Sequence, residues 1–282
     1  MSELFPKLPL DRWVERLVQY LDEHFGLVFD VISAIIGSTV DLFALIFTSL
    51  PDWLLILVFT LLAYMVGRLR VALFTLIGLL LIANLGYWEH SMETLALVLT
   101  AGLISIVIGV PAGILCARKD SVRNVVTPLL DFMQTMPAFV YLIPAIFFFG
   151  LGKVPGVIAS VIFAMPPTIR LTNLGIRQVP GELIEASDAF GATSWQKLFK
   201  VQLPLAKTTI MAGVNQSIML ALSMVVIASM IGAKGLGADV YRAVTQINIG
   251  TGFEAGLAIV IMAILLDRIT QNMGKKKNLR EG

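Results

Sequence analysis

The sequence predicts an all-α integral membrane protein with about seven membrane spans, or eight if one further segment crosses, preceded by an N-terminal amphipathic helix. Of the 282 residues, 57% are hydrophobic and only 14% are charged. An ordinary soluble domain is roughly 45 to 50% apolar and about 25% charged. The apolar residues also form long blocks, several of which reach the roughly 20 residues that a helix needs to cross about 30 Å of hydrocarbon.

The N-terminal segment, residues 1–50, combines two patterns. Between Leu10 and Phe25, apolar residues recur on one helical face with charged residues between them, which is typical of a helix lying in the membrane interface. A soluble cap is the alternative. Residues 27–49 carry a stripe of polar or small residues, including Asp30 and Asp41, on an otherwise apolar helix. They therefore either cross the membrane or lie on its surface.

Residues 51–273 are predicted to form one membrane domain, followed by a basic cytoplasmic tail at 274–282. Its expected spans are 52–66, 69–87, 92–117, 128–150, 154–172, 208–233 and 252–272. Lys and Arg accumulate in cytoplasmic loops, and they gather in alternate connections and in the C-terminal tail. The C-terminus and the long connection after residue 172 are therefore predicted to be cytoplasmic.

The residue types that catalysis or metal binding requires are scattered along the chain. His24 and His90 lie far apart, Cys116 has no second cysteine as a partner, and no GxxxxGK[ST] phosphate-binding loop occurs. We expect no catalytic residue, cofactor or metal, so any ATP hydrolysis belongs to a partner. Trp53 and Trp88 fall at span ends, where aromatic belts occur without any ligand. We therefore assign no substrate-binding residue.

The connection at 173–207 is too long and too patterned for a simple turn. Pro180 can open one short helix, Gly191 can end it, and Thr193 with Gln196 forms a candidate capping box for a second helix that Pro204 limits. We call residues 180–204 the knob. Its exposed apolar residues suit either a groove on another protein or the membrane surface.

The segment EASDAFGATSWQKLFKVQLP resembles the EAA loop of ABC importer permeases. The residues that fall on the motif's offsets are Glu185, Ala186, Gly191, Val201, Leu203 and Pro204. Ser187 stands where the motif has a second Ala, which replaces one small residue by another. The resemblance implies a type I ABC importer transmembrane domain whose knob docks into a separate ATPase subunit.

The runs at 136–150, 162–170 and 215–237 are similar to glycine betaine/proline permeases of the osmoprotectant uptake family, and the likeness covers nearly all of 50–272. It implies import of glycine betaine, carnitine, proline betaine or proline. It also implies a homodimer of this chain, two ABC ATPase subunits and, since the chain ends at Gly282, a separate external binding protein. Lipid is expected as a further partner and nucleic acid is not.

The alternatives are a secondary transporter driven by an ion gradient, which usually carries ionisable groups buried in mid-span, and a scaffold or receptor. Asp131 follows Thr127 and Pro128 and is assigned to a helix N-terminus in preference to transport chemistry. Asp267 and Arg268 are expected to face the membrane interface. Apart from Asp30 and Asp41 in the uncertain segment 27–49, the clear spans are expected to lack such groups at their centres, which favours the importer.

Overall fold

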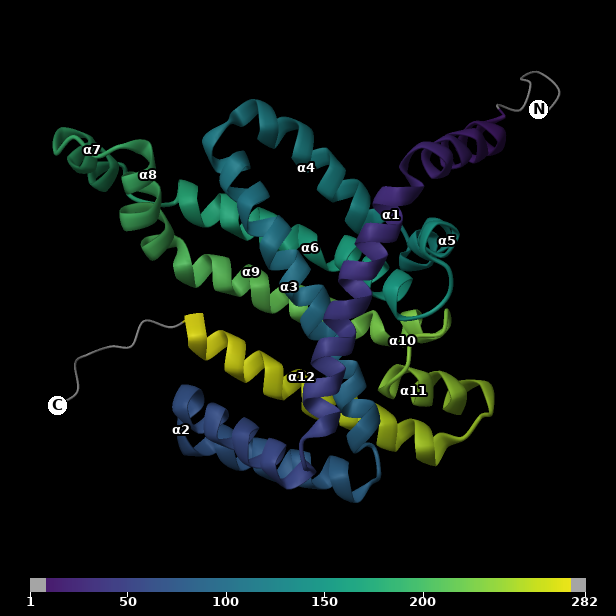
Figure 1. Cartoon of the computed structure of the whole chain (residues 1–282). Helices are drawn as coiled ribbons and strands as arrows, with labels where there is room; N and C mark the ends of the chain where they lie inside the picture. Colours follow the sequence, from purple (N-terminus) through teal and green to yellow (C-terminus); the bar gives the residue numbers. More distant parts are fainter. Residues whose placement is uncertain (1–8, 275–282) are drawn as a thin grey trace, which may run out of the picture.

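The computed structural model describes residues 9–274, and every regular element in this range is a helix (Figure 1). The predictions for residues 1–8 and for the tail after residue 274 concern residues outside this range. The elements are α1 (Leu10–Ser49), α2 (Asp52–Asn84), α3 (Trp88–Arg118), α4 (Asp120–Thr135), α5 (Ala138–Phe149), α6 (Lys153–Arg177), α7 (Gly181–Ala189), α8 (Ser194–Lys197), a π-helical turn (Leu198–Gln202), α9 (Leu203–Ser223), α10 (Val225–Ser229), α11 (Leu236–Thr245) and α12 (Ile249–Gly274).

The described residues contain six helices long and apolar enough to cross a membrane, and the bent pair α4 and α5 makes up to seven. This confirms the predicted all-α membrane class. α1 is one of the six, so residues 27–49 have the length and composition of a span. The predicted interfacial segment at 10–25 and this span belong to one uninterrupted helix.

The centre of the bundle is built from α3, α6 and α9, which pack closely against one another. Small residues allow this approach, as is common between membrane helices. A Cβ atom added to Gly113 of α3 would lie 2.7 Å from the carbonyl oxygen of Ile169, and one added to Gly213 of α9 would lie 2.9 Å from that of Pro167. The hydroxyl groups of Thr168 and Ser217 share a hydrogen bond of 2.7 Å between α6 and α9.

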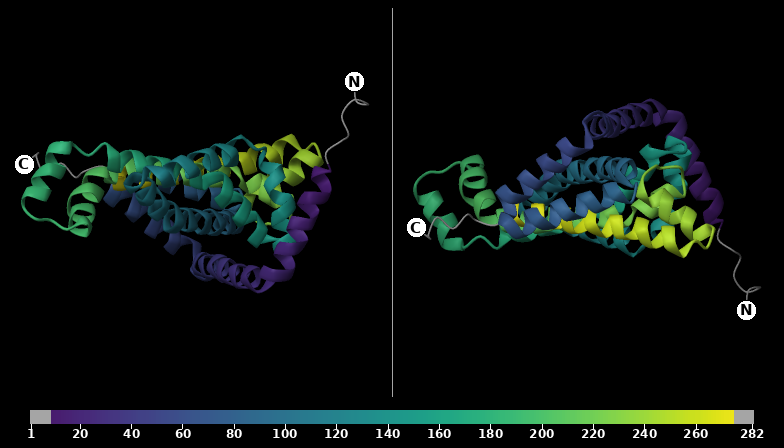
Figure 2. Two further views of the ribbon diagram at one scale, coloured as in Figure 1. Left: turned by 90° about the horizontal axis from the view of Figure 1, so that it is seen from above. Right: turned by 90° about the horizontal axis from the view of Figure 1, so that it is seen from below.

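The bundle is elongated, with α7 and α8 projecting from one end (Figure 2). We call this the knob end. α12 runs back through the bundle and finishes on the same side (Figure 1). α1 crosses over the bundle and contacts α3, α5 and α6. α2 contains a break at Arg68, where φ is 61° and ψ is −168°, between the spans expected at 52–66 and 69–87.

The segment expected as one continuous span at 128–150 is interrupted, because α4 and α5 meet at a bend of 100°. Pro137 explains the break: a proline lacks the N–H of a helical hydrogen bond and disfavours helical geometry in the preceding residue. Met136 is accordingly extended, with φ −67° and ψ 135°.

The assignment of Asp131 to a helix N-terminus is also wrong. α4 begins at Asp120, so Asp131 lies in its C-terminal half and pairs with Arg170 of α6 at 2.6 Å. Asp267 likewise does not simply face the interface. It accepts a hydrogen bond of 2.8 Å from the Asn215 side chain, which links α12 to α9.

The span expected at 208–233 begins earlier, at Leu203, and it ends in a short helix, α10, after an irregular turn at Met224. The helix α11, in the following connection, was not predicted from the sequence. Asp239 of α11 pairs with His90 of α3 at 2.5 Å. This contact holds the connection against the bundle at the end opposite the knob.

Candidate functional site

The knob is a helical hairpin that projects beyond the bundle (Figures 1 and 2). Pro180 precedes α7, and the chain turns at Phe190–Thr193 before α8 begins at Ser194. α6 leads into the hairpin and α9 leads out of it, and these two helices pack along their length. The knob is therefore joined at both ends to the centre of the bundle.

Gly191 makes the turn of the hairpin. Its φ is +72°, a left-handed conformation that glycine adopts without the steric penalty of a Cβ atom. Its N–H donates to the Asp188 carbonyl at 2.9 Å, and the N–H of Ala192 donates to the Ser187 carbonyl at 3.0 Å. A Cβ atom on Gly191 would meet nothing within 4 Å, so the constraint is the backbone conformation alone.

The predicted capping box forms. The Thr193 hydroxyl accepts from the N–H of Gln196 at 3.3 Å, and the Gln196 side chain accepts from the N–H of Thr193 at 2.8 Å. These two bonds satisfy donors that the start of a helix leaves unpaired. The second arm of the knob therefore starts at a defined residue.

The expectation that Pro204 limits the second helix is wrong. Helical geometry continues from Ser194 through Ser223, and a π-helical turn at Leu198–Gln202 precedes the proline. The N–H of Leu203 bonds to the carbonyl of Leu198, five residues back. A π turn shifts the hydrogen-bond register where the proline supplies no donor, and it lets the knob and α9 form one continuous element.

The six EAA-like residues divide into two groups. Four are exposed on the knob, namely Glu185, Ala186, Gly191 and Pro204, whereas Val201 and Leu203 are half-buried. Leu203 packs against the cluster of Ile176, Leu198 and Ala206 at the base of the knob. The first group presents a surface and the second fastens that surface to the bundle.

The surface beside the exposed group is aromatic. Phe190 is 90% exposed and Trp195 is 64% exposed, and the rings of Trp195 and Phe199 stack with centroids 5.4 Å apart. Exposed aromatic groups of this kind mark contact surfaces for other molecules. The knob thus exposes aromatic side chains, and the carboxylate of Glu185 is exposed on α7 of the same knob.

Sequence reasoning missed the residues that hold the knob in place. The Arg118 guanidinium, at the end of α3, donates to the Ser194 carbonyl at 3.0 Å and lies 5.6 Å from the centre of the Trp195 ring. Lys197 pairs with Asp188 across the hairpin. In the sequence, Arg118 and Lys197 count only among the basic residues that indicate orientation, and their spacing carries no signal for these contacts.

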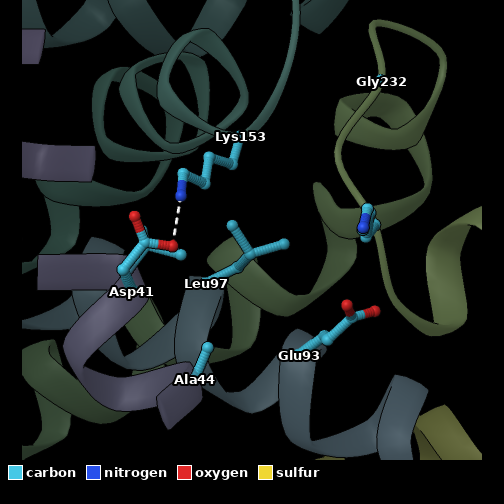
Figure 3. Close-up of a pocket in the computed structure, with 8 residues that line it drawn as sticks. Asp41, Ala44, Glu93, Leu97, Lys153 and Gly232 are labelled. Atoms are coloured by element: carbon cyan, nitrogen blue, oxygen red, sulfur yellow. Dashed lines mark hydrogen bonds and ion pairs between the residues drawn. The ribbon is translucent and has the colours of Figure 1, made fainter. Parts of the chain in front are cut away.

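A second site is a pocket of about 360 Å³ at the end opposite the knob, between α1, α3, α6 and the connection before α11. Figure 3 shows Lys153 paired with Asp41, while the Glu93 carboxylate is directed away from that pair. The charged residues that line the pocket are Asp41, Glu93, Lys153 and Lys234. The two carboxylates balance the two ammonium groups, and the Asp41–Lys153 pair fastens α1 to the start of α6.

Comparison with known proteins agrees with these features. The family model described as "Binding-protein-dependent transport system inner membrane component" matches residues 109–277. The glycine betaine transport system permease protein OpuAB of Bacillus subtilis is 60% identical over 275 residues, which cover 98% of each chain. The glycine betaine/carnitine transport permease protein GbuB of Listeria monocytogenes is 58% identical over 275 residues, covering 96% of this chain and 97% of that one.

The glycine betaine/proline betaine transport system permease protein ProW of Escherichia coli is 50% identical over 273 residues, covering 97% of this chain and 77% of that one. The chain therefore belongs to the family of binding-protein-dependent transport system inner membrane components, and it is a multi-pass membrane protein. The resemblance to osmoprotectant permeases seen in the sequence is confirmed.

Two solved chains of the inward-facing MetNI methionine ABC transporter share the fold. Their TM-scores are 0.59 and 0.61, each is 24% identical, and the matches cover 65% and 67% of this chain and 93% and 96% of theirs. This likeness confirms the predicted fold of a type I ABC importer transmembrane domain.

Proposed function

We propose that the chain is the membrane-spanning permease subunit of an ATP-driven importer for glycine betaine or related quaternary amines such as carnitine, proline betaine or proline. The relatives that match over nearly the whole chain support this function, since their names describe glycine betaine, carnitine or proline betaine permeases. The protein would serve osmoprotection. It would not itself be an enzyme, and a partner subunit would hydrolyse ATP.

The single observation that carries the coupling role is the rigid, aromatic knob. Its exposed face carries aromatic side chains, as contact surfaces for other proteins often do. Its second arm continues into α9, and α6 leads into its first arm through a short turn. Closure of two ATPase subunits around two such knobs would tilt these helices and switch the pore between outward and inward access. Glu185, Ala186 and Gly191 would form the contact, and Val201 and Leu203 would transmit the movement through the base of the knob. Pro204 is exposed where the knob joins α9.

The proposed assembly contains two copies of this chain, two ABC ATPase subunits and an external substrate-binding protein, in lipid. The knob end would face the cytoplasm. Arg118, Lys119 and Arg123 lie at the junction of α3 and α4, and Arg177 ends α6 near the knob, which agrees with the accumulation of positive charge on the cytoplasmic side. The C-terminus would then be cytoplasmic as well.

The test is uptake of labelled glycine betaine into proteoliposomes that hold this chain with its candidate ATPase and binding protein. Uptake should require ATP, and Glu185→Lys should lower it at least about tenfold, which corresponds to ~1.4 kcal/mol of docking free energy. Glu182→Lys is the matched control, because Glu182 is also exposed on α7 but lies outside the motif.

Two results would contradict this proposal. Uptake driven by a sodium or proton gradient without ATP would identify a secondary transporter. Equal uptake by the Glu185→Lys and wild-type proteins, with ATP still required, would leave the importer in place but remove the coupling role from Glu185.

A further inference from the structure

α4 has three faces of different chemistry. One face is apolar and packs against the cluster formed by Cys116 and Ile169, and its residues are Val122, Val126, Leu130 and Met133. The second is apolar and exposed, and its residues are Val125, Leu129 and Phe132. The third, which we call the polar stripe, consists of Asp120, Asn124, Thr127, Asp131 and Gln134.

The polar stripe follows the helical repeat from the first residue of α4 almost to its end, with alternating intervals of four and three residues. Such spacing keeps the side chains on one side of the helix. Asn124, Thr127 and Asp131 are exposed and Gln134 is half-buried. An apolar and a polar surface therefore run side by side along the exposed part of α4.

Two arginines of α6 meet this stripe. Arg170 pairs with Asp131 at 2.6 Å, and Arg177 pairs with Asp120 at 2.7 Å. The two arginines are seven residues apart and so project from one side of α6. The Asp131–Arg170 pair is not covered by the protein, since 62% of the Asp131 side chain and 40% of the Arg170 side chain are exposed.

The depth of this pair decides what can lie against it. α6 has 25 residues, which at about 1.5 Å per residue extend about 37 Å. Arg170 is five residues from its centre, about 8 Å along the axis. With the centre of α6 at the middle of the bilayer, this lies inside a hydrocarbon layer that reaches about 15 Å on either side. Charged groups at that depth face water or a protein partner, because exposure to lipid is costly.

The interrupted backbone after α4 indicates water independently of the charges. The chain breaks at Met136 and Pro137, directly beyond the stripe, and Pro137 is exposed. The Tyr141 hydroxyl donates to the Met133 carbonyl at the end of α4. Irregular backbone at membrane depth is tolerated where it is buried in protein or lines a water-filled cavity, and the exposure of Pro137 favours the cavity.

We propose that the polar stripe of α4 and Arg170 line the inner part of the solute path, and that Asp131 and Arg170 contact a zwitterionic solute there. The Arg170 guanidinium would bind the solute carboxylate through paired N–H donors, and the Asp131 carboxylate would face the quaternary ammonium group. Without solute the two side chains neutralise each other. This inference rests on the proposed function, which supplies the class of solute.

Cysteine labelling tests the lining role without requiring transport. Single cysteines are introduced by Thr127→Cys and Gln134→Cys, with Val125→Cys and Phe132→Cys as controls of similar depth on the exposed apolar face. Each cysteine is introduced into a chain whose native cysteine is removed by Cys116→Ala. The same cysteines are also tested in the otherwise unaltered chain, because Cys116 is buried and should not react. Inside-out vesicles with the permease and its ATPase are treated with a membrane-impermeant methanethiosulfonate that carries a trimethylammonium group.

The stripe cysteines should react at least about tenfold faster than the controls. Equal rates on the two faces would overturn the lining role. Stripe cysteines that resist the reagent and instead form disulfides between two copies would also overturn it and identify the stripe as a contact between copies.

Protection by solute tests the contact role. Glycine betaine should slow the labelling of Gln134→Cys, and adding Asp131→Asn or Arg170→Gln should raise the half-protecting concentration at least about tenfold. Asp131→Glu, which keeps the charge, should retain most of the protection by glycine betaine. If Asp131→Glu also loses this protection, Asp131 has a structural role in place of a contact with the solute. ATP-driven uptake with an unreactive stripe would refute only this inference, and a reactive stripe without any uptake of betaine would refute only the proposed function.

Discussion

The knob and the polar stripe of α4 both expose side chains that do not suit the expected solvent, but in opposite ways: the knob exposes apolar groups where water is expected, and the stripe exposes charged groups where lipid is expected. The knob exposes Phe190 and Trp195 beyond the end of the bundle, where water is expected. The stripe exposes Asp131 beside Arg170, whose position along α6 corresponds to a depth where lipid is expected. Exposing the knob to water, or the stripe to lipid, costs free energy. Each surface therefore indicates another neighbour, which is a protein groove for the knob and water for the stripe.

The two surfaces also differ in how they are supported. The knob is fastened by Arg118, by the capping box of Thr193 and by a π turn that continues into α9. The stripe is joined to α6 by ion pairs whose members remain partly exposed. A surface that transmits force must be rigid, whereas one that contacts a passing solute must exchange its partners. α6 connects the two, since it carries Arg170 and leads into the knob.

The largest effect is expected from Phe190→Ser combined with Trp195→Ser. Burying a large apolar side chain contributes about 1.5 to 3 kcal/mol, so the double variant should weaken association with the ATPase about 100-fold or more. Binding is measured with the permease in lipid nanodiscs. The thermal unfolding temperature should fall only slightly, because both side chains are exposed and only the surface contacts of Trp195 with Arg118 and Phe199 are lost. Val125→Ser combined with Leu129→Ser should leave ATPase binding unchanged, and an equal loss there would remove the distinction between the two surfaces.

Gly213→Val tests whether the packing of α6 on α9 connects the two surfaces. The new Cβ would lie 2.9 Å from the Pro167 carbonyl oxygen and 3.0 Å from the Leu171 side chain. Overpacking of this kind costs about 1 to 3 kcal/mol, measured as a lower thermal unfolding temperature. Gly256→Ala is the control, since its Cβ would meet nothing within 4 Å and should stabilise α12 by about 0.5 to 1 kcal/mol. Equal destabilisation by both variants would contradict the close packing at Gly213.

Gly191→Val tests the rigidity of the knob. A side chain at φ +72° costs about 1 to 2 kcal/mol, so the turn should shift and transport should fall while ATP hydrolysis continues. The measured quantity is solute imported per ATP hydrolysed. Gly181→Ala is the matched control, because this glycine has an ordinary φ and open space around it. An unchanged ratio in Gly191→Val would show that the turn geometry is not needed for coupling.

The smallest effect is expected from Asp131→Ala on stability. If water covers Arg170, leaving its guanidinium unpaired should cost less than about 1 kcal/mol, the usual range for exposed ion pairs. An unpaired arginine facing lipid would cost about 2.5 kcal/mol or more. The free energy of unfolding of Asp131→Ala, measured in nanodiscs, distinguishes contact with water from contact with lipid. A loss of stability of about 2.5 kcal/mol or more would place the stripe against lipid.

Local patterns allowed the knob to be predicted almost completely. Thr193 and Gln196 are three residues apart, and a capping box requires only that spacing. Gly191 follows a short helical run, and a helix commonly ends at such a glycine. Pro204 was misjudged because a proline alone does not show whether a π turn will carry the helix past it.

The stripe was not recognised although its residues were all visible in the sequence. In the sequence, Pro128 suggests the start of a span, which divides the stripe and places Asp131 in a first turn. Only the packing of Val122, Val126, Leu130 and Met133 on α3 and α6 shows where α4 begins and which side remains exposed. The partners Arg170 and Arg177 are distant in the chain, so no local pattern reports those pairs.

The sequence by itself determined the membrane class, the family and the local form of the knob, because hydrophobic block length, motif spacing and capping act over short stretches of chain. The tertiary structure decided which face of α4 is exposed, where the span at 128–150 breaks and which charges pair. Those outcomes depend on contacts between helices far apart in the sequence, whose free energies arise only when the helices pack together.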